Sequence, residues 1–210
     1  MGTESTTLVW YAAYGSNCSP ARFHTYLEGG TPPGGSHVHR GARDPSLPHA
    51  DGPITFPSAV CFRGHSTWWG GAPAFLEHAR AEIGALGRRY LITLEQFEDV
   101  LAQENRLDEP LPVDPGHPVG ARQVLVDRPY GQVVNLPPVD GYPVLTFTSP
   151  QPAEHRDPAP PSAAYLGTIV RGLAGAHPLT HDEIASHLLR ASGVADGWDH
   201  ASILDLLAQP

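Results

Sequence analysis

The chain has 210 residues, of which 40% are hydrophobic and 17% are charged, a length and composition that suit one globular domain over residues 1–210. Its 22 acidic and 13 basic side chains give a formal charge of −9, and no Lys/Arg run follows a phosphate backbone, so a nucleic-acid partner is not expected. No apolar run reaches the roughly 18 residues of a membrane span and the first residues are polar, so neither a membrane nor export is expected.

The first predicted elements are a strand, a turn and a helix in immediate succession. A β-branched and aromatic run at residues 7–14 predicts a buried strand that ends at Gly15. Ser19 before Pro20 has the order of a helix N-cap followed by the first helical residue, so a helix is expected to start there.

The next segment, residues 28–57, is dominated by Gly, Pro, His and Asp, with only a weak strand pattern at 37–39. This composition predicts a mostly irregular, loop-rich connection. Strands are expected afterwards at residues 58–62 and 88–92, where β-branched and aromatic side chains gather.

A clear helix is predicted to begin at Thr93, because Thr93 and Gln96 form a capping box before apolar residues at helical spacing. With Phe97 at the centre of the apolar face, Glu104 lies about 20° away, so its side chain is expected to point inward. An inward carboxylate is a common proton carrier in enzymes.

The other acidic residues of this helix, and an alternative for Glu104, have also to be considered. Glu95 and Asp99 fall on the opposite side and are expected to be ordinary solvated carboxylates. For Glu104 the alternative is that the helix ends there, with the carboxylate fraying into solvent and paired with Arg106.

The C-terminal half completes an α+β pattern. An apolar segment at residues 165–170 is either helix or strand, and a capping box from Thr180 to Glu183 predicts a helix near the end. Further strands are expected at residues 123–126, 132–134 and 144–147. The predicted fold class is α+β, with a mixed or antiparallel sheet that is barrel-like and flanked by helices.

The turn formed by Tyr14, Gly15, Ser16 and Asn17 leaves a strand and enters a helix, so its backbone N–H groups can converge on a carboxylate or an oxyanion. The alternative is that Gly-Ser-Asn is ordinary turn chemistry and binds nothing. The residues alone leave both readings open.

The run from Tyr11 to Asn17 resembles the Tyr-Gly-Ser-Asn signature of the gamma-glutamylcyclotransferases. Three later segments are similar to that family in the same order: a Trp and Gly segment of the substrate pocket, a helix segment that ends in the catalytic Glu, and a Tyr-x6-Gly arrangement, which here are Trp69-Gly70-Gly71, residues 101–104, and Tyr165 with Gly172. The chain departs from the family at Asn105, where Gly is usual, and in residues 28–57, which have no counterpart.

The resemblance implies the family's fold and the cyclisation of a γ-glutamyl group to 5-oxoproline, with Glu104 as general acid/base and an amine released. It implies that the backbone amides of Gly15, Ser16 and Asn17 anchor the glutamyl unit and that Tyr14 and Tyr165 flank it. Trp69, Gly70 and Gly71 would belong to the same pocket. No metal, nucleotide or other cofactor is implied, and the Tyr-Gly-Ser-Asn form makes glutathione a less expected substrate.

The signature residues would bind only the glutamyl head of the substrate. Residues 28–57 are therefore expected to border the pocket mouth and to select the acceptor, which is the group attached to that head. Shortening this segment is expected to change substrate preference more than folding stability.

Three competing functions remain open at this point. Cys18 at a helix start can be a nucleophile in a thiol amidase or acyltransferase. The histidines at 37 and 39 suggest a metal site but lack a third ligand, and solvated loop histidines are the expected reading. A non-catalytic member of the fold that binds a small ligand or a protein is the third.

With Cys18 and Cys61 outside any CxxC pair, a cytoplasmic location is expected.

Overall fold

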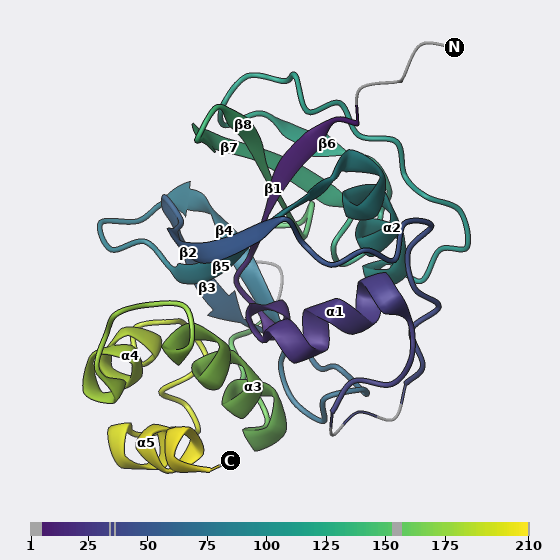
Figure 1. Cartoon of the computed structure of the whole chain (residues 1–210). Coiled ribbons are helices and arrows are strands. Elements are labelled where there is room, and N and C mark those ends of the chain that lie inside the picture. Colours follow the sequence, from purple (N-terminus) through teal and green to yellow (C-terminus); the bar gives the residue numbers. More distant parts are fainter. Residues whose placement is uncertain (1–5, 34, 36, 153–156, 210) are drawn as a thin grey trace, which may run out of the picture. The chain divides into compact units, whose positions relative to one another are not determined.

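The computed structural model of the chain describes residues 6–33, 35, 37–152 and 157–209 (Figure 1). The polar start at residues 1–5 and positions 34 and 36 of the loop-rich segment lie outside the described residues. The backbone divides into two compact units, each built from three stretches of chain: Met1–Ala12, His24–Asp51 and Arg89–Pro150 in the first, and Ala13–Phe23, Gly52–Arg88 and Gln151–Pro210 in the second. The expectation of a single domain stays a prediction.

The main sheet has six strands in the order β2-β5-β1-β8-β7-β6. The strands are β1 (Leu8–Ala13), β2 (Ala50–Thr55), β5 (Leu86–Thr93), β6 (Arg122–Val124), β7 (Gln132–Val139) and β8 (Tyr142–Thr148). β1 and β8 run parallel, whereas β8 with β7 and β7 with β6 are antiparallel. The α+β class and the mixed sheet are confirmed. The outer strands, β2 and β6, are not paired with each other in the described part of the chain, so the sheet is open and does not close into a barrel.

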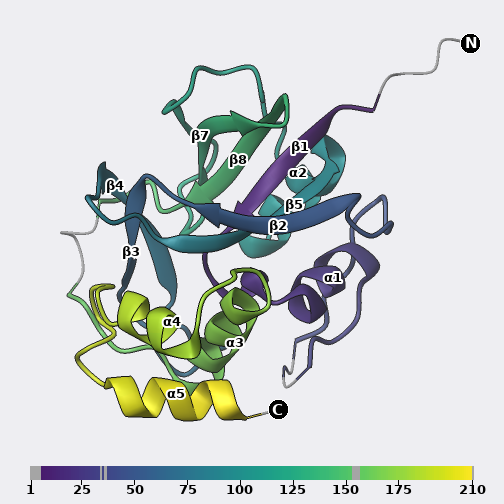
Figure 2. The same ribbon diagram turned by 60° about the vertical axis from the view of Figure 1, so that its left-hand side comes forward.

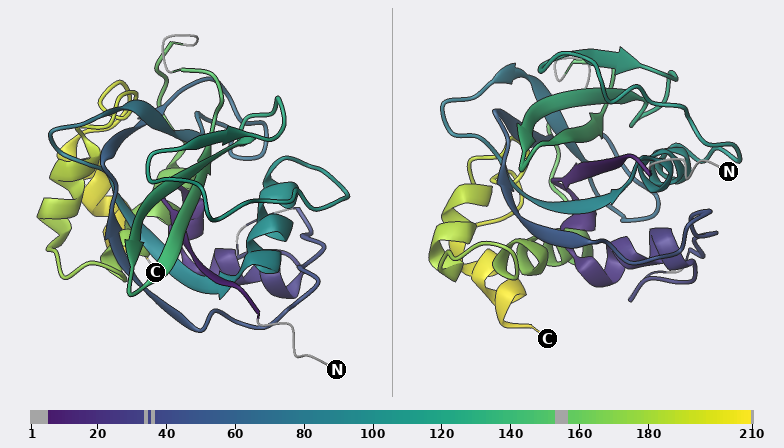
Figure 3. Two further views of the ribbon diagram at one scale, coloured as in Figure 1. Left: turned by 90° about the horizontal axis from the view of Figure 1, so that it is seen from above. Right: turned by 45° about the horizontal axis from the view of Figure 1, so that its top comes forward.

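The first unit packs an aromatic core between the sheet and α2 (Leu94–Glu104). The Tyr11 ring lies 5.2 Å from Phe147 of β8 and 5.8 Å from Phe97 of α2, measured between ring centroids. β7 and β8 form the green hairpin of Figure 3, whose two-residue turn has positive φ at Asp140 and Gly141. Such a turn is favoured in hairpins because its backbone twist matches that of the strands, and Asp-Gly is typical of it because both positions require positive φ.

The second unit combines a two-stranded antiparallel sheet with helices. Its elements are the 3-10 helix η1 (Ser16–Cys18), the strands β3 (Ser58–Phe62) and β4 (Ala74–Arg80), and the helices α3 (Ala163–Ala174), α4 (His181–Leu188) and α5 (His200–Ala208). α3, α4 and α5 contact one another as one group (Figure 2). α1 (Pro20–Glu28) begins in this unit and continues into the first. Within the described ranges, no helix is long and apolar enough to cross a membrane.

Most predicted elements appear at their expected positions, including both capping boxes, at Thr93 and Thr180. The apolar segment at 165–170, which periodicity left undecided, is part of helix α3. The described part of residues 28–57 is mostly irregular, as expected, but it includes β2, which was not predicted. The Asp-Gly-Pro sequence of β2 is a poor strand former and is tolerated because the strand lies at the edge of the sheet. β4 and α5 were not predicted.

Candidate active site

The turn that leaves β1 is buried and tightly closed. The N–H of Cys18 donates a hydrogen bond to the carbonyl of Gly15 at 3.0 Å, which forms η1 directly after the strand. Tyr14, Ser16 and Asn17 are all buried. The predicted order of strand, turn and helix start is therefore confirmed, and the four residues expected to form a cradle for an anion lie in this turn.

Tyr165 lies against this turn. Its hydroxyl accepts a hydrogen bond from the N–H of Ala74 at 3.2 Å, and a Cβ placed on Gly15 would lie only 3.0 Å from the same oxygen. The missing side chain at Gly15 thus lets the hydroxyl approach the backbone closely. On the other side, the Tyr165 ring lies 4.7 Å from the Trp69 ring. Three of the sequence-predicted site residues are therefore neighbours.

Trp69, Gly70 and Gly71 form a tight turn that is closed on both sides by Ser66. The Ser66 N–H donates to the Gly71 carbonyl, and the Gly70 N–H donates to the Ser66 carbonyl, both at 2.8 Å. Gly70 has a φ of +66°, which favours glycine, and a Cβ on Gly71 would lie 2.4 Å from the backbone nitrogen of Ser162. The presence of two glycines is therefore explained by the structure, since they allow the turn to place Trp69 close to the start of α3.

Arg22, which the sequence analysis did not single out, joins the same cluster. Its Nε donates to the Ser16 hydroxyl at 2.9 Å, and its guanidinium carbon lies 4.6 Å from the centre of the Trp69 ring. The residue is 8% exposed. The sequence signal was an arginine in the first turn of a predicted helix, beside the apolar position Phe23, and this pattern alone does not separate a buried cation from a solvated one.

This cluster combines aromatic walls with a buried positive charge. Cation–π contact and a hydrogen bond fix the guanidinium of Arg22 beside the turn. A desolvated cation next to a strand-to-helix turn favours an anionic group such as a carboxylate. The arrangement therefore suits a small molecule that carries a carboxylate.

Cys18, the alternative nucleophile, is completely buried, and its Sγ donates to the carbonyl of Ala13 at 3.3 Å. Helix α3 covers it closely, because a Cβ on Gly172 would lie 2.4 Å from the Cys18 carbonyl carbon. Burial raises the pKa of the Cys18 thiol to about 12. The thiol is therefore protonated near neutral pH, which is the opposite of what a nucleophile needs.

Glu104 belongs to the first unit, where it is the last residue of α2 and is half-buried. The helix therefore ends at Glu104, as the alternative expected, but the residue is not fully exposed. Asn105, the C-cap, is buried, and its side-chain amide donates to the carbonyls of Leu101 at 2.9 Å and Tyr130 at 3.1 Å, while its oxygen accepts from the Tyr130 N–H. Asn at this position thus ties the helix end to a loop. That Glu104 lines the same site as the cradle stays a prediction.

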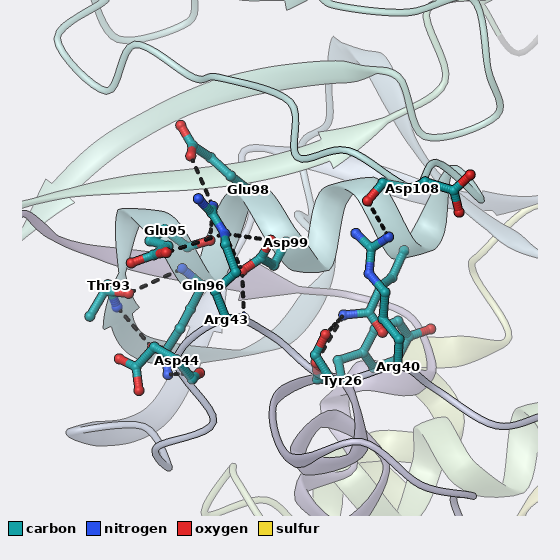
Figure 4. Close-up of polar contacts among 12 residues, drawn as sticks. Tyr26, Arg40, Arg43, Asp44, Thr93, Glu95, Gln96, Glu98, Asp99 and Asp108 are labelled. Atoms are coloured by element: carbon teal, nitrogen blue, oxygen red, sulfur yellow. Dashed lines mark hydrogen bonds and ion pairs between the residues drawn. The ribbon is translucent and has the colours of Figure 1, made fainter.

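The loop-rich segment fastens α2 along its outer side (Figure 4). Arg43 binds Asp99 through its backbone N–H at 2.9 Å and its Nε at 3.0 Å, and it also pairs with Glu95 and Glu98. The expectation that Asp99 is a solvated carboxylate is wrong, because this contact leaves it 3% exposed. Gln96 adds hydrogen bonds from its side-chain nitrogen to the carbonyls of residues 44 and 46. Residues 40–46 are therefore a strap on α2.

The histidine expectation is also corrected in part. His39 is buried and its ring lies 4.0 Å from the Tyr26 ring, so it is not a solvated loop side chain. Its backbone forms an isolated antiparallel bridge with Gly30, so the weak strand pattern at 37–39 corresponds to a single bridge and not to a strand. In the described part of the chain, no group of three or more His, Cys, Asp or Glu side chains is arranged to hold a metal ion.

No established family profile matches the sequence. In an alignment of 205 positions that covers 87% of this chain and 30% of the other, it is 36% identical to histone deacetylase 5 of Arabidopsis thaliana. The structure is similar to that of a gamma-glutamyl cyclotransferase, with a TM-score of 0.54 and 17% identity over 95% of this chain and 98% of the other. It is also similar to the crystal structure of an uncharacterized protein from Homo sapiens, with a TM-score of 0.53 and 16% identity over 96% and 99% of the two chains.

The structural likeness extends over nearly the whole of each chain. At these identities it shows the fold and leaves the activity to the site. The mixed sheet with flanking helices is therefore the gamma-glutamyl cyclotransferase fold.

Proposed function

We propose that the protein is a cyclotransferase that converts a γ-glutamyl group to 5-oxoproline and releases the attached amine. The observation that supports this most strongly is the cluster of Gly15, Trp69 and Tyr165 around the turn after β1, with the buried cation Arg22 beside it. These residues include the sequence motifs that resemble the cyclotransferases, and they lie in a chain with the same fold.

In the proposed reaction, the backbone amides of Gly15, Ser16 and Asn17 hold the glutamyl head, with Tyr14 and Tyr165 on either side. Glu104 accepts a proton from the α-amino group, whose nitrogen then attacks the γ-carbonyl carbon. The bond from that carbon to the leaving amine breaks, and Glu104 returns the proton to the amine. Because amine and carbonyl belong to one molecule, the protein mainly has to hold the substrate folded, which can lower the barrier by several kcal/mol.

The experiment is a panel of γ-glutamyl peptides and γ-glutamyl amines incubated with the protein and assayed for released 5-oxoproline. Glu104→Gln keeps the shape of the side chain but removes its exchangeable proton, so turnover should fall about 10²- to 10⁴-fold while substrate binding is largely kept. Glu95→Gln is the matched control on the same helix, and its turnover should be unchanged. Full turnover in Glu104→Gln would show that another group is the base.

The non-catalytic reading of the fold has its own outcome in this experiment. Binding of γ-glutamyl compounds by the wild-type protein without any 5-oxoproline would favour a ligand-binding role. The activity named in the Arabidopsis relative is not proposed for this chain, which matches 30% of that protein. A γ-glutamyl small molecule as the partner and a cytoplasmic location are parts of the same proposal.

The choice of acceptor is proposed to depend on residues 28–57. A deletion that tests this proposal has to leave the strap of residues 40–46 in place. Shortening the segment through residues 40–46 would remove Arg43 and its contacts with α2 and would therefore disturb the helix that carries Glu104. A deletion confined to residues 30–38 leaves the strap in place. Unchanged selectivity of that variant across the γ-glutamyl panel would show that this part of the segment plays no role in specificity.

A further inference from the structure

The second unit contains an apolar cleft next to Tyr14, the first residue of the proposed cradle. Its floor consists of buried side chains from the strands and helices of this unit: Tyr14, Val60, Phe62, Leu173 and Leu188. The cleft is small, with a volume of about 70 Å³, and is partly open to solvent, and Ile83 at its rim is 52% exposed. A mostly apolar lining with a few polar groups is typical of small-molecule sites.

Two polar side chains lie at the rim of this cleft, and both offer hydrogen-bond donors. The N–H of Leu86 donates to Nε2 of His187 at 3.2 Å, so Nε2 carries no proton and the neutral ring presents Nδ1–H. Burial lowers the pKa of His187, and the charges of Arg190 and His177 lower it further, which keeps the ring neutral. Among the described residues, the guanidinium of Arg190 has no hydrogen-bond or ion-pair partner.

The two carboxylates that share a neighbouring hollow with Arg190 have other contacts. Asp182 and Glu183 line a neighbouring hollow together with Arg190, but neither lines the cleft. Glu183 accepts hydrogen bonds from Thr180 in the capping box, and Asp182 lies 3.8 Å from the His200 ring. The rim of the cleft therefore offers donors and a positive charge, above a floor of hydrocarbon.

We propose that this cleft binds an apolar monocarboxylate, with its hydrocarbon on the floor and its carboxylate at Arg190 and the Nδ1–H of His187. A guanidinium is well suited to a carboxylate because it offers paired N–H donors in one plane. The apolar residue at the acceptor end of a γ-glutamyl dipeptide has the same chemistry as a free apolar acid. The binding proposal does not depend on the catalytic one.

The test is a titration of the full chain with hexanoate, hexan-1-ol and hexylammonium, which share a hydrocarbon and differ in charge. Binding is followed by the shifts of the Leu86 and Ala191 amide signals in ¹H–¹⁵N NMR spectra. Hexanoate should bind about tenfold more tightly than hexylammonium, with hexan-1-ol between them. Equal affinities for the three, or no shift of these two amides, would overturn the proposal.

Two variants and a control locate the site. Arg190→Gln should lower the affinity for hexanoate about tenfold and leave that for hexan-1-ol unchanged. Ala59→Leu, at a half-buried position of β3 that lines the cleft, should weaken the binding of both compounds by filling it. Arg128→Gln changes an exposed arginine of the other unit and should have no effect. Unchanged hexanoate binding in folded Arg190→Gln and Ala59→Leu proteins would contradict the assignment.

The two sources of the ligand are distinguished by competition. If the cleft receives the acceptor residue of a substrate, saturating hexanoate should weaken the binding of γ-glutamyl-leucine. If it receives a separate acid, the two should bind together without loss of affinity. Since hexanoate binding is measured without turnover, a failure of 5-oxoproline formation leaves this test intact, and the two proposals fail separately.

Discussion

At the scale of single residues, two neighbours of the cradle differ in chemistry. Arg22 and Cys18 both adjoin the turn after β1, and both are buried. The guanidinium remains charged when it is buried, because arginine does not lose its proton in proteins. The thiol responds to burial by holding its proton more tightly. In the proposed function, the charge that attracts an anion to this turn is therefore that of Arg22, and nucleophilic attack by Cys18 is disfavoured.

The raised pKa of Cys18 predicts a direction for the pH dependence of stability. In the unfolded chain the thiol has its ordinary pKa of 9.0, whereas burial raises the folded value to about 12. Its contribution to the free energy of unfolding is therefore complete below about pH 9 and is lost as the pH rises toward 12. Urea unfolding at pH 8 and at about pH 10.5 should show a loss of stability that is smaller in Cys18→Ala.

Cys61 also stabilises the folded protein less as the pH rises, because burial raises its pKa to about 11. Each single cysteine variant therefore removes only part of the loss of stability at high pH. The Cys18→Ala protein should also keep its turnover of γ-glutamyl compounds. Rapid alkylation of Cys18 by iodoacetamide in the native protein at pH 8, or loss of turnover in a folded Cys18→Ala variant, would restore the nucleophile hypothesis.

At the scale of elements, α3 is brought close to η1 by Gly172. A Cβ at this position would lie 2.4 Å from the carbonyl carbon of Cys18, which is backbone and cannot rotate away. Gly172→Ala should therefore destabilise the protein by about 1–3 kcal/mol, although alanine is the better helix former.

Gly167 on the same helix is the matched control. Its added Cβ would meet the end of the Arg171 side chain at 3.1 Å, and a long side chain can move. Gly167→Ala should be neutral or stabilise the protein by up to about 1 kcal/mol. Equal effects of the two substitutions in urea denaturation would show that α3 is not held by the contact at Gly172.

The strap of residues 40–46 predicts an effect on α2. Arg43→Ala leaves the buried carboxylate of Asp99 without its cation, and because half of the Arg43 side chain is exposed the loss should be about 2 kcal/mol. In the double variant Arg43→Ala with Asp99→Asn, part of this loss should be recovered. Additive losses would mean that the ion pair contributes nothing to the free energy of unfolding.

At the scale of the whole molecule, local sequence patterns predicted their strands and helix starts correctly, whereas contacts between residues far apart in the sequence were not predicted. The strand before Gly15 and the capping boxes at Thr93 and Thr180 are local signals, and each appears where it was predicted. The buried state of Asp99 was missed because its partner, Arg43, is 56 residues away in sequence. The apolar face of α2 follows from helical spacing alone, whereas the inward position of Glu104 stays a prediction, since the residue is half-buried.

The site shows the same division. Motif order identified Gly15, Trp69 and Tyr165, which the fold brings together, but Arg22 had no motif of its own. The lining of the apolar cleft comes from segments between residues 14 and 191, and no local pattern predicts that they meet. β2 was missed because sheet pairing, not strand propensity, holds its Asp-Gly-Pro sequence extended.

The central claim is that the α-amino group of the substrate, and not water or a thiol, attacks the γ-carbonyl. The most direct test is to incubate the protein with its best γ-glutamyl substrate in H₂¹⁸O and to analyse the products by mass spectrometry. Cyclisation predicts 5-oxoproline without ¹⁸O and no glutamate, because no water oxygen enters the bond that forms. Glutamate that carries ¹⁸O in its γ-carboxylate would contradict the account and identify the protein as a hydrolase.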